Sequence, residues 1–339
     1  MKILVTGAAG FIGFHLSRRL AERGDEVVGL DSINDYYPTS LKYDRLAELG
    51  ISHRAEEWGE KVTSSKYPAL SFVRMRLEDR ASLERLFHTE CFDVVVNLAA
   101  QAGVRYSITN PREYIDSNII GFLNIIECTA HYCPNHLIYA SSSSVYGDNR
   151  SVPFREEDRV DNPASMYAVT KRTNEMMALV FSKLYMLPTT GLRFFTVYGS
   201  WGRPDMAPMI FARAISDGQP IEVFNGGDME RDFTHISDII EGVTRIIDHK
   251  PDKLGDRPLA QVYNIGCSSP VNLMDFIAEM ERAVGRKAIK EMRPMQAGDV
   301  KTTYADTTKL QSDFGYRPHV SLREGIGEFI AWYNQYFGK

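Results

Sequence analysis

Short apolar runs alternate along the chain with longer segments in which apolar residues recur at helical spacing. The runs that predict β-strands cover residues 2–6, 26–31, 71–74, 93–98, 136–140, 188–195 and 262–265. Helices are predicted at residues 14–23, 41–49, 111–132, 166–184, 207–217, 236–249, 272–284 and 322–336. Because repeated strand–helix units build sheets with helices on both faces, the pattern predicts an α/β fold with a doubly wound parallel sheet.

The character of the sequence changes after Gly199, where regular strand–helix alternation gives way to loops and short elements. We therefore predict a first domain at residues 1–199. Strand and helix elements at about 234–266 are predicted to return to this domain. Residues 200–233 and 267–339 form the predicted second domain, which is smaller and interleaved with the first.

A glycine turn follows the first predicted strand, with Gly7, Gly10 and Gly13 at the spacing of a dinucleotide-binding turn. Gly7 permits the tight turn, Gly10 lets the backbone approach a pyrophosphate, and Gly13 lets the helix pack on the strand. Asp31 ends the second strand 18 residues after Gly13, where a carboxylate accepts hydrogen bonds from the adenosine ribose and repels a 2′-phosphate. The pattern predicts a Rossmann-type domain that binds NAD rather than NADP; the alternative is a strand–turn–helix unit without a nucleotide.

Other residues at strand ends are candidates for the same cofactor. Glu78 and Asp79 follow the third sheet strand, where an acid often contacts adenine, although Arg76 leaves that contact open. Small residues at the end of strand 93–98 leave space for a cofactor at the sheet edge. The residues assigned to NAD are Gly7, Gly10, Phe11, Ile12, Gly13, Asp31, Asn34, Glu78, Asp79, Leu98, Ala99, Ala100, Tyr167 and Lys171.

A tyrosine and a lysine four residues apart, Tyr167 and Lys171, lie on the predicted helix 166–184. This spacing places both on one helix face, within reach of each other. A phenol has a pKa of about 10, and a cation beside it lowers that pKa enough to make a usable acid/base. Such a pair alone is also typical of an ordinary helix surface, so its significance depends on the serine run Ser141–Ser144 upstream.

Composition excludes several classes of function. The chain has 339 residues, 24% charged and 44% hydrophobic, with a net charge of −5, which argues against nucleic-acid or anionic-membrane partners. The four cysteines lack metal-ligand spacing, so we expect reduced thiols and no metal. We find no signal-peptide pattern and no apolar run of about 18 residues, and therefore expect a soluble, cytoplasmic protein.

The glycine turn, the serine run and Tyr167-x-x-x-Lys171 together resemble an extended short-chain dehydrogenase/reductase of the type that modifies nucleotide sugars. More narrowly, four segments are similar to UDP-glucuronate 4-epimerases of the NAD-dependent epimerase/dehydratase family. These segments are residues 99–107, 193–199, 203–206 and 231–234. The resemblance covers essentially the whole chain and implies an isomerase that binds a UDP-sugar and a tightly held NAD⁺.

This resemblance implies a mechanism in which Tyr167, as phenolate, removes the proton of the sugar 4-hydroxyl while the C4 hydride passes to NAD⁺. Lys171 lowers the phenol pKa and binds the nicotinamide ribose, and Ser142 relays the proton. The transient 4-keto sugar rotates and receives the hydride on its opposite face, so NAD⁺ is regenerated in each turnover. Related dehydratases carry an Asp-Glu pair where this chain has Ser143-Ser144, which disfavours dehydration.

The resemblance also assigns the substrate contacts. A 4-keto uronate is a β-keto acid that loses CO₂ readily, and Ser143, Ser144 and Thr196 are expected to hold its carboxylate against decarboxylation. The guanidinium of arginine can bind two oxygens of the diphosphate, and a strand edge with an apolar face can bind the uracil base. Arg203 and Arg231 are assigned to the diphosphate, Val223 and Phe224 to the uracil, and Asp299 to the uridine ribose. The full set of expected substrate-binding residues is Arg105, Ser142, Ser143, Ser144, Thr196, Arg203, Val223, Phe224, Arg231 and Asp299.

Alternatives remain at this point. One is a 4-epimerase of neutral UDP-hexoses such as UDP-glucose or UDP-N-acetylglucosamine, against which Thr196 argues because glucose enzymes usually carry asparagine there. Others are a UDP-glucuronate decarboxylase and a catalytically silent NAD-sensing protein on the same fold. The resemblance further implies a homodimer formed through the helices near residues 111–132 and 166–184.

Overall fold

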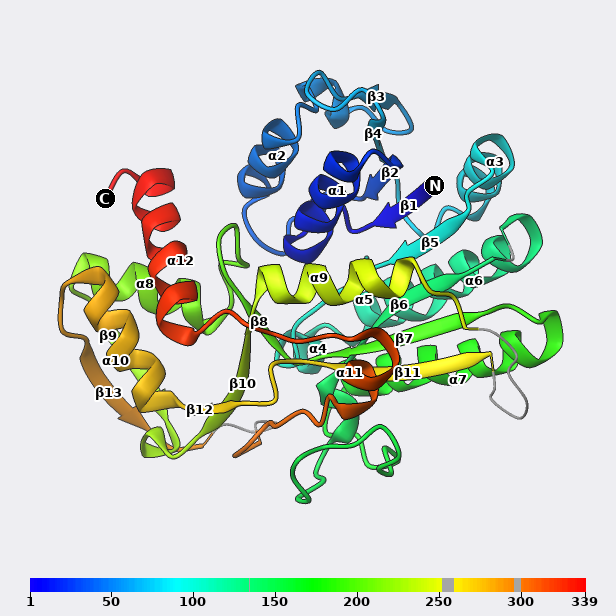
Figure 1. The fold of residues 1–339 in the computed structure, drawn as a ribbon. Helices are drawn as coiled ribbons and strands as arrows, with labels where there is room; N and C mark the ends of the chain where they lie inside the picture. The colour runs from blue at the N-terminus through cyan, green and yellow to red at the C-terminus, as the bar shows by residue number, and fades with distance from the viewer. Residues whose placement is uncertain (134, 252–258, 296–299) are drawn as a thin grey trace. The chain divides into compact units, whose positions relative to one another are not determined.

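The computed structural model describes residues 1–133, 135–251, 259–295 and 300–339 (Figure 1). It contains two compact units. The first unit comprises Met1–Gly147, Val160–Arg193 and Val243–Tyr263, and the second comprises Asp148–Arg159, Phe194–Gly242 and Asn264–Lys339.

The first unit is organised around an eight-stranded sheet. Its strands are β1 (Lys2–Thr6), β2 (Glu26–Asp31), β3 (Lys61–Thr63), β4 (Leu70–Arg74), β5 (Val94–Asn97), β6 (Leu137–Ser142), β7 (Thr189–Phe194) and β11 (Ala260–Ile265), in the order β11-β7-β6-β5-β1-β2-β4-β3. β1 pairs in parallel with both β2 and β5, so the chain winds outward from the middle in two directions. This arrangement confirms the predicted doubly wound parallel sheet. β3, in the insertion after residue 34, runs antiparallel to its neighbour β4.

Most helices of the first unit were predicted, but the helices Arg80–Glu90 and Tyr106–Thr109 were not. The helices of this unit are α1 (Phe11–Arg23), α2 (Thr39–Glu48), α3 (Arg80–Glu90), α4 (Tyr106–Thr109), α5 (Pro111–Ile115), α6 (Gly121–Tyr132) and α7 (Met166–Tyr185). The predicted helix 111–132 is present, and its turn at Asp116–Ile120 is π-helical. Pro111 begins α5 as expected, but the Asn110 side chain does not cap it. Leu4, Val28, Val95 and Leu137 are among the fully buried side chains that join the sheet to its helices.

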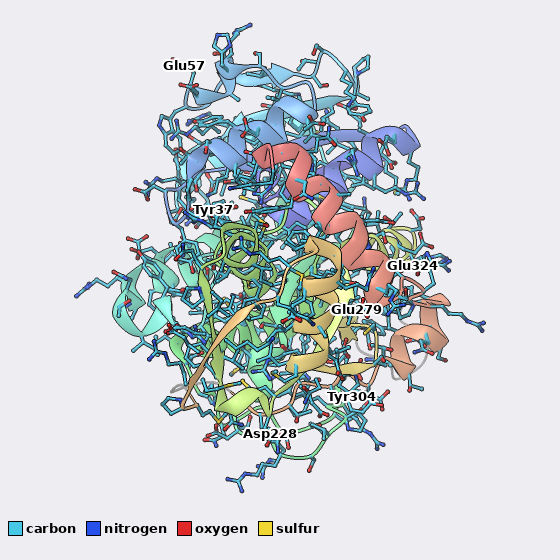
Figure 2. All side chains as sticks on the ribbon, turned by 90° about the vertical axis from the view of Figure 1, so that its left-hand side faces the viewer. Tyr37, Glu57, Asp228, Glu279, Tyr304 and Glu324 are labelled. Carbon is cyan, nitrogen blue, oxygen red and sulfur yellow. The ribbon has the colours of Figure 1, made fainter. Side chains whose placement is uncertain are left out.

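The second unit contains two small sheets and four helices among its described residues. Its strands are β8 (Thr196–Tyr198), β9 (Pro220–Phe224), β10 (Glu230–His235), β12 (Pro270–Asn272) and β13 (Ile289–Arg293), and its helices are α8 (Ala207–Asp217), α10 (Leu273–Val284), α11 (Thr308–Phe314) and α12 (Leu322–Phe337). Stacked Phe233 and Phe276, with centroids 4.1 Å apart, lie in its core. Ser321 and Glu324 cap α12 reciprocally, and Glu324 is labelled in Figure 2.

The units divide the chain at different residues from the predicted domains. Residues 148–159 group with the second unit because Phe154 pairs with the segment after Lys301: its N–H donates to the Tyr304 carbonyl and its carbonyl accepts from Asp306. Residues 194–199 also belong to the second unit, while α9 (Ile236–Ile247) begins in the second unit and ends in the first. None of the described helices combines the length and apolarity needed to cross a bilayer.

Candidate active site

The glycine turn connects β1 to α1 and requires glycine for steric reasons. Gly7 has φ +72°, and a Cβ there would lie 2.9 Å from the backbone nitrogen of Ala99. A Cβ on Gly13 would lie 2.1 Å from the Gly7 carbonyl oxygen, and one on Gly10 2.9 Å from that same oxygen. The turn is therefore as tight as the sequence predicts, and it lies against the end of β5.

Helix α1 begins at this turn without a side-chain cap. Gly10 stands at the N-cap position and has no side chain to occupy the first N–H groups, which belong to Phe11 and Ile12. Uncapped N–H groups and the positive end of the helix dipole form a site for a phosphate group. The turn thus fits the pyrophosphate of a dinucleotide.

Asp31 lies at the carboxyl end of β2, beside the turn. Its carboxylate accepts hydrogen bonds from the backbone N–H of Ala9 at 3.2 Å and of Ile33 at 2.8 Å, one to each oxygen. These bonds fix a buried carboxylate beside the turn, and each oxygen keeps a lone pair for a ribose hydroxyl. Asp31 is placed where its predicted role requires, although that role stays a prediction.

The predicted residues Leu98, Ala99 and Ala100 follow β5 at the same sheet edge. The Ala99 N–H donates to the Thr6 hydroxyl at 3.1 Å, and that hydroxyl donates to Asn97 at 2.6 Å. Side-chain hydrogen bonds therefore connect the ends of β1 and β5. The carboxyl ends of parallel strands meet at one edge of the sheet, so residues that follow each strand could be predicted to lie there from the sequence.

The other cofactor candidates already contact the chain itself. Asp79 caps α3 by accepting from the Ser82 N–H, and hydrogen bonds from Ser82 lower the pKa of this carboxyl. Glu78 accepts from the Ser117 hydroxyl at 3.0 Å. Arg76 is exposed, and its guanidinium lies 5.9 Å from the Trp58 ring. The adenine contact predicted for Glu78 or Asp79 stays a prediction.

Tyr167 and Lys171 lie one turn apart on α7, as predicted. The Lys171 ammonium is 5.9 Å from the centroid of the Tyr167 ring and donates to the Ala140 carbonyl at 2.8 Å. Burial lowers the pKa of Lys171 to about 8, so the amine remains mostly charged at pH 7. The Tyr167 ring packs edge-on against Tyr114, with centroids 6.1 Å apart.

The serine run supplies the end of β6 and the turn after it. Ser142 is the last residue of the strand, and Ser143 begins a 3₁₀ turn that ends at Tyr146. The Ser142 hydroxyl accepts from the Ser144 N–H at 3.1 Å and lies 3.2 Å from the Ser144 hydroxyl. Ser142 thus caps the turn, and its hydroxyl is held in one position.

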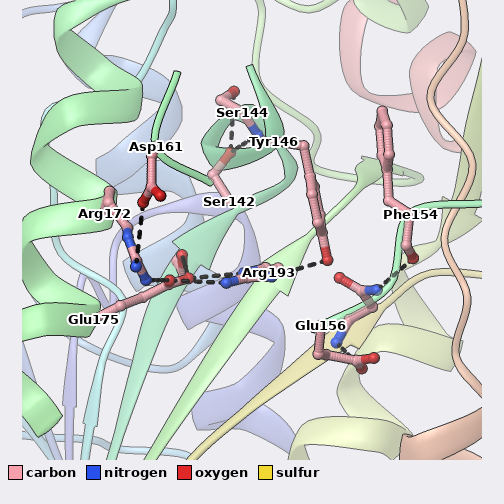
Figure 3. A network of polar contacts seen from close by, with 11 residues as sticks. Ser142, Ser144, Tyr146, Phe154, Glu156, Asp161, Arg172, Glu175 and Arg193 are labelled. Atoms are coloured by element: carbon pink, nitrogen blue, oxygen red, sulfur yellow. Dashed lines mark hydrogen bonds and ion pairs between the residues drawn. The ribbon is translucent and has the colours of Figure 1, made fainter. Parts of the chain in front are cut away.

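A buried ion pair, which sequence reasoning missed, connects the elements that carry these residues (Figure 3). The Arg193 guanidinium on β7 binds Glu175 on α7 through two hydrogen bonds of 2.8 and 2.9 Å. Glu175 also accepts from the Ser141 hydroxyl at 2.6 Å and from Arg172 at 3.1 Å, and Arg193 donates to the Tyr146 hydroxyl at 3.0 Å. The sequence signal for this pair was an arginine between Leu192 and Phe194 in a predicted strand.

Asn118 was also missed. It lies in the π-helical turn at 116–120 and is buried, and its amide accepts from the Gln101 N–H at 2.8 Å and donates to the Gln101 carbonyl at 3.0 Å. The amide also contacts the Thr170 hydroxyl, while the Asn118 carbonyl accepts from Asn174 at 2.7 Å. The π turn therefore places one residue where it joins the loop after β5 to α7, a common use of such turns.

The predicted diphosphate ligands lie in the second unit and contact acceptors of the chain. Arg203 makes a two-pronged ion pair with Asp205, at 3.0 and 2.5 Å. Arg231 donates to the carbonyls of Glu230 and Lys301 at 2.8 and 3.0 Å. Both guanidiniums are partly exposed, and their roles stay predictions.

The remaining substrate candidates belong to different elements of the two units. Thr196 begins β8 of the second unit, and Val223 and Phe224 end β9, where Val223 is fully buried in that unit's core. Arg105 precedes α4 in the first unit. Asp299 lies outside the described residues.

Four of the histidines contact neighbouring residues of the chain. His131 contacts the Glu127 carbonyl within α6, and His249 contacts the Arg245 carbonyl at the end of α9. His235 contacts Ser237, and His15 packs on Phe14. All four cysteines are unbridged. The part of the chain that the structure describes contains no group of histidine, cysteine or acidic side chains arranged to hold a metal ion.

The sequence matches the NAD dependent epimerase/dehydratase family over residues 3–266. The chain belongs to this family. Protein CapI of Staphylococcus aureus is 48% identical, with each chain covered over 100% of its length. A probable UDP-glucuronate 4-epimerase of Rhizobium meliloti is 44% identical over 99% of this chain and 97% of that protein.

A solved structure supports the same assignment at the level of the fold. The UDP-glucuronic acid 4-epimerase from Bacillus cereus, in complex with UDP-glucuronic acid and NAD, superposes with a TM-score of 0.87. It is 32% identical, over 99% of this chain and 100% of that chain. The resemblance on which the sequence interpretation depends is thereby confirmed.

Proposed function

We propose that this epimerase family member interconverts UDP-glucuronate and UDP-galacturonate by NAD-dependent epimerisation at C4, without loss of the carboxylate. The observation that carries the proposal is that Ser142, Tyr167 and Lys171 occur together in a chain that matches UDP-glucuronate 4-epimerases over its full length. The first unit would bind NAD, and residues of the second unit would bind the UDP portion of the sugar.

The cofactor would be held by groups whose geometry fits a dinucleotide. The N–H groups of Phe11 and Ile12 at the start of α1 suit the pyrophosphate, and the Asp31 carboxylate suits the adenosine ribose hydroxyls. Lys171 would donate to the nicotinamide ribose. Bound NAD⁺ would supply a reversible acceptor for the hydride of the sugar C4.

Tyr167 is proposed as the acid/base. It accepts the proton of the 4-hydroxyl as C4 is oxidised. After the 4-keto sugar has rotated, it gives that proton back to the 4-keto oxygen. The buried, charged Lys171 favours the phenolate form, which is the form that accepts a proton. The Ser142 hydroxyl, held by Ser144, relays the proton between the sugar and the phenol.

The substrate carboxylate sets the second requirement. A 4-keto uronate decarboxylates when its carboxylate bond aligns with the carbonyl π system. Hydroxyl groups that hold the carboxylate out of this alignment suppress the loss, and Ser143, Ser144 and Thr196 are the proposed groups. Arg203 and Arg231 would exchange their present acceptors for diphosphate oxygens, and Phe224 would contact the uracil. Val223, which was predicted beside it, is fully buried in the core, so its side chain is not available for that contact.

NMR of UDP-glucuronate incubated with the purified protein tests this proposal. We expect UDP-galacturonate with an intact C6 carboxylate and no net NADH. Formation of UDP-xylose or a 4-keto pentose would instead indicate a decarboxylase. Turnover of UDP-glucose or UDP-N-acetylglucosamine, with none of UDP-glucuronate, would retain the mechanism and overturn the substrate.

We also propose a homodimer, formed through α6 and α7, which pack on each other. Exposed apolar side chains form a stripe along α7 at helical spacing: Val169, Met176, Val180 and Leu184. A monomer rarely exposes such a stripe. Light scattering should give a dimer mass for the native protein and a monomer mass for Val180→Glu; a monomeric native protein at micromolar concentration would exclude the dimer.

A cytoplasmic location is proposed from the thiols. Cys128 and Cys133 are buried and unbridged, and burial raises the pKa of each to about 12, which keeps them protonated and unreactive. Unbridged cysteines are typical of reducing compartments. Localisation of a tagged full chain by fractionation would test this.

A further inference from the structure

The insertion after β2 contacts the glycine turn directly, through a residue that the sequence did not single out. Arg45, on α2, is fully buried, and its guanidinium donates to the Ala9 carbonyl at 2.9 Å. The same nitrogen donates to the Tyr37 hydroxyl at 2.8 Å (Tyr37 is labelled in Figure 2). A buried guanidinium thus holds the backbone of the turn on which the cofactor pyrophosphate is proposed to lie.

The backbone at Ala9 is held from both sides. Its N–H donates to Asp31 at 3.2 Å, and its carbonyl accepts from Arg45. The next N–H, of Gly10, donates to the Gly7 carbonyl at 2.8 Å. Because the peptide groups before and after Ala9 are both fixed, the N–H groups that follow, at the start of α1, keep their direction.

A second contact joins the same insertion to the loop after β5. The Lys42 ammonium donates to the carbonyl and to the side-chain oxygen of Asn34, both at 2.7 Å, and lies 4.8 Å from the Tyr37 ring. Asn34 in turn donates to the Gln101 side chain at 3.2 Å. The insertion therefore connects two sheet-edge segments, the glycine turn and the β5 loop, that are both assigned to the cofactor.

We propose that residues 34–48, here called the latch segment, retain the dinucleotide between turnovers. Arg45 holds the glycine turn in its phosphate-binding form. Lys42 holds Asn34, which binds Gln101 in the loop after β5. Release of the cofactor then requires these buried contacts to loosen. The proposal rests on the proposed function, since an enzyme that regenerates NAD⁺ in every turnover has no need to release it.

Cofactor exchange tests the latch segment without using activity. Each purified protein is loaded with NAD⁺, freed of excess ligand and mixed with isotopically labelled NAD⁺, and bound label is followed over time. Arg45→Met keeps an unbranched apolar stem and removes the guanidinium, and we expect exchange ~10- to 100-fold faster than in the native protein, from the usual strength of a buried hydrogen bond to a charged group. Tyr37→Phe, which removes one acceptor, should give a smaller acceleration.

Arg54→Met is the matched control. Arg54 belongs to the same insertion, but it is exposed and pairs with Glu60 at the surface. Its variant should exchange at the native rate. Far-UV circular dichroism checks folding; if Arg45→Met does not fold, Tyr37→Phe decides the outcome.

Native exchange rates in both Arg45→Met and Tyr37→Phe would overturn the latch and leave the proposed function intact. A native protein that binds no NAD⁺ at all would overturn the proposed function together with the latch. The two failures are distinguishable, because the first is seen only in the variants and the second in the native protein.

Discussion

The proposed catalytic residues of the first unit and the proposed diphosphate ligands of the second are held in different ways. Glu175 and Arg193, which connect α7, β6 and β7, have side chains only 2% and 3% exposed. Arg203 and Asp205 are 22% and 28% exposed, and Arg203 contacts an acid two residues away. The elements that carry the proposed acid/base residues are thus joined by buried contacts, whereas the proposed anion ligands are bound to acceptors that a diphosphate could replace.

This difference has a physical basis. Acid/base chemistry depends on groups held in place before the reaction, so fixed positions are favoured. Breaking a buried pair by removing one partner costs roughly 3–5 kcal/mol, whereas an exposed pair contributes roughly 0–1 kcal/mol. Substitutions should therefore affect folding and turnover in the first region, and mainly substrate affinity in the second.

The largest expected effect is that of Tyr167→Phe. Loss of the acid/base should lower kcat by a factor of about 10² to 10⁴, while binding of UDP persists, because the proposed diphosphate ligands are untouched. Turnover by chromatography and UDP binding by calorimetry measure the two quantities. Activity near the native level would exclude Tyr167 as the acid/base.

Lys171→Met should abolish most turnover without destabilising the fold at neutral pH. Burial lowers the pKa of Lys171 to about 8 from an ordinary 10.5, so burying the charged amine destabilises the native protein below pH 8. The unfolded chain binds the extra proton between about pH 8 and 10.5, and native stability contributed by this group therefore rises with pH across that window, by on the order of 3 kcal/mol.

Thermal unfolding of the native and Lys171→Met proteins between pH 7 and 10.5 measures this. The unfolding temperature of the native protein should rise relative to that of Lys171→Met as pH increases from 7 to 10.5. A constant difference would contradict a buried, charged Lys171.

Glu175→Gln should destabilise the protein by roughly 3–5 kcal/mol and lower kcat, because it leaves a buried Arg193 without its anion and loosens Ser141 beside Ser142. Burial raises the pKa of Glu175, but the hydrogen bonds and charge of Arg193, with Ser141 and Arg172, outweigh it and lower the pKa overall. The stabilisation is therefore complete above about pH 4.5, the ordinary pKa, and is lost as pH falls below it.

Glu279→Gln is its control (Glu279 is labelled in Figure 2). Hydrogen bonds from Arg323 and Arg282 lower the pKa of Glu279 to about 2, but this cluster is on the surface. Solvent screens it, and its loss should cost less than about 1 kcal/mol. Urea unfolding of both variants gives the comparison; equal losses would show that burial does not set the strength of these clusters.

The smallest effect on stability is expected for Arg203→Ala. We expect the KM for the UDP-sugar to rise about tenfold, equivalent to about 1.4 kcal/mol, with a native unfolding midpoint. Steady-state kinetics and thermal unfolding measure these two quantities. A fall in stability with unchanged KM would mean that the Arg203–Asp205 pair is structural.

Local pattern was enough for much of the fold. The strand Lys2–Thr6, the glycine turn and Asp31 were readable because each depends on residues close in sequence, and helix Met166–Tyr185 because its apolar period is long. The Tyr167–Lys171 relation follows from helix geometry alone. These parts require no knowledge of tertiary contacts.

The features that sequence analysis did not predict depend on contacts between residues far apart in the chain. The Arg193–Glu175 pair joins residues 18 positions apart on a strand and a helix, and Arg45 reaches Ala9 across 36 positions. In the π turn at 116–120, Asn118 binds Gln101, 17 positions away. Residues 148–159 join the second unit because Phe154 pairs near Tyr304. Period and turn chemistry carry no information about such pairings.

The most direct test of the central claim follows the hydrogen at C4. UDP-glucuronate deuterated at C4 is incubated with the protein in ordinary water, and the product is examined by NMR and mass spectrometry. If the hydride is removed and returned within one active site, UDP-galacturonate keeps the deuterium at C4 and retains C6. Loss of the deuterium to solvent, or formation of a five-carbon product, would contradict the account.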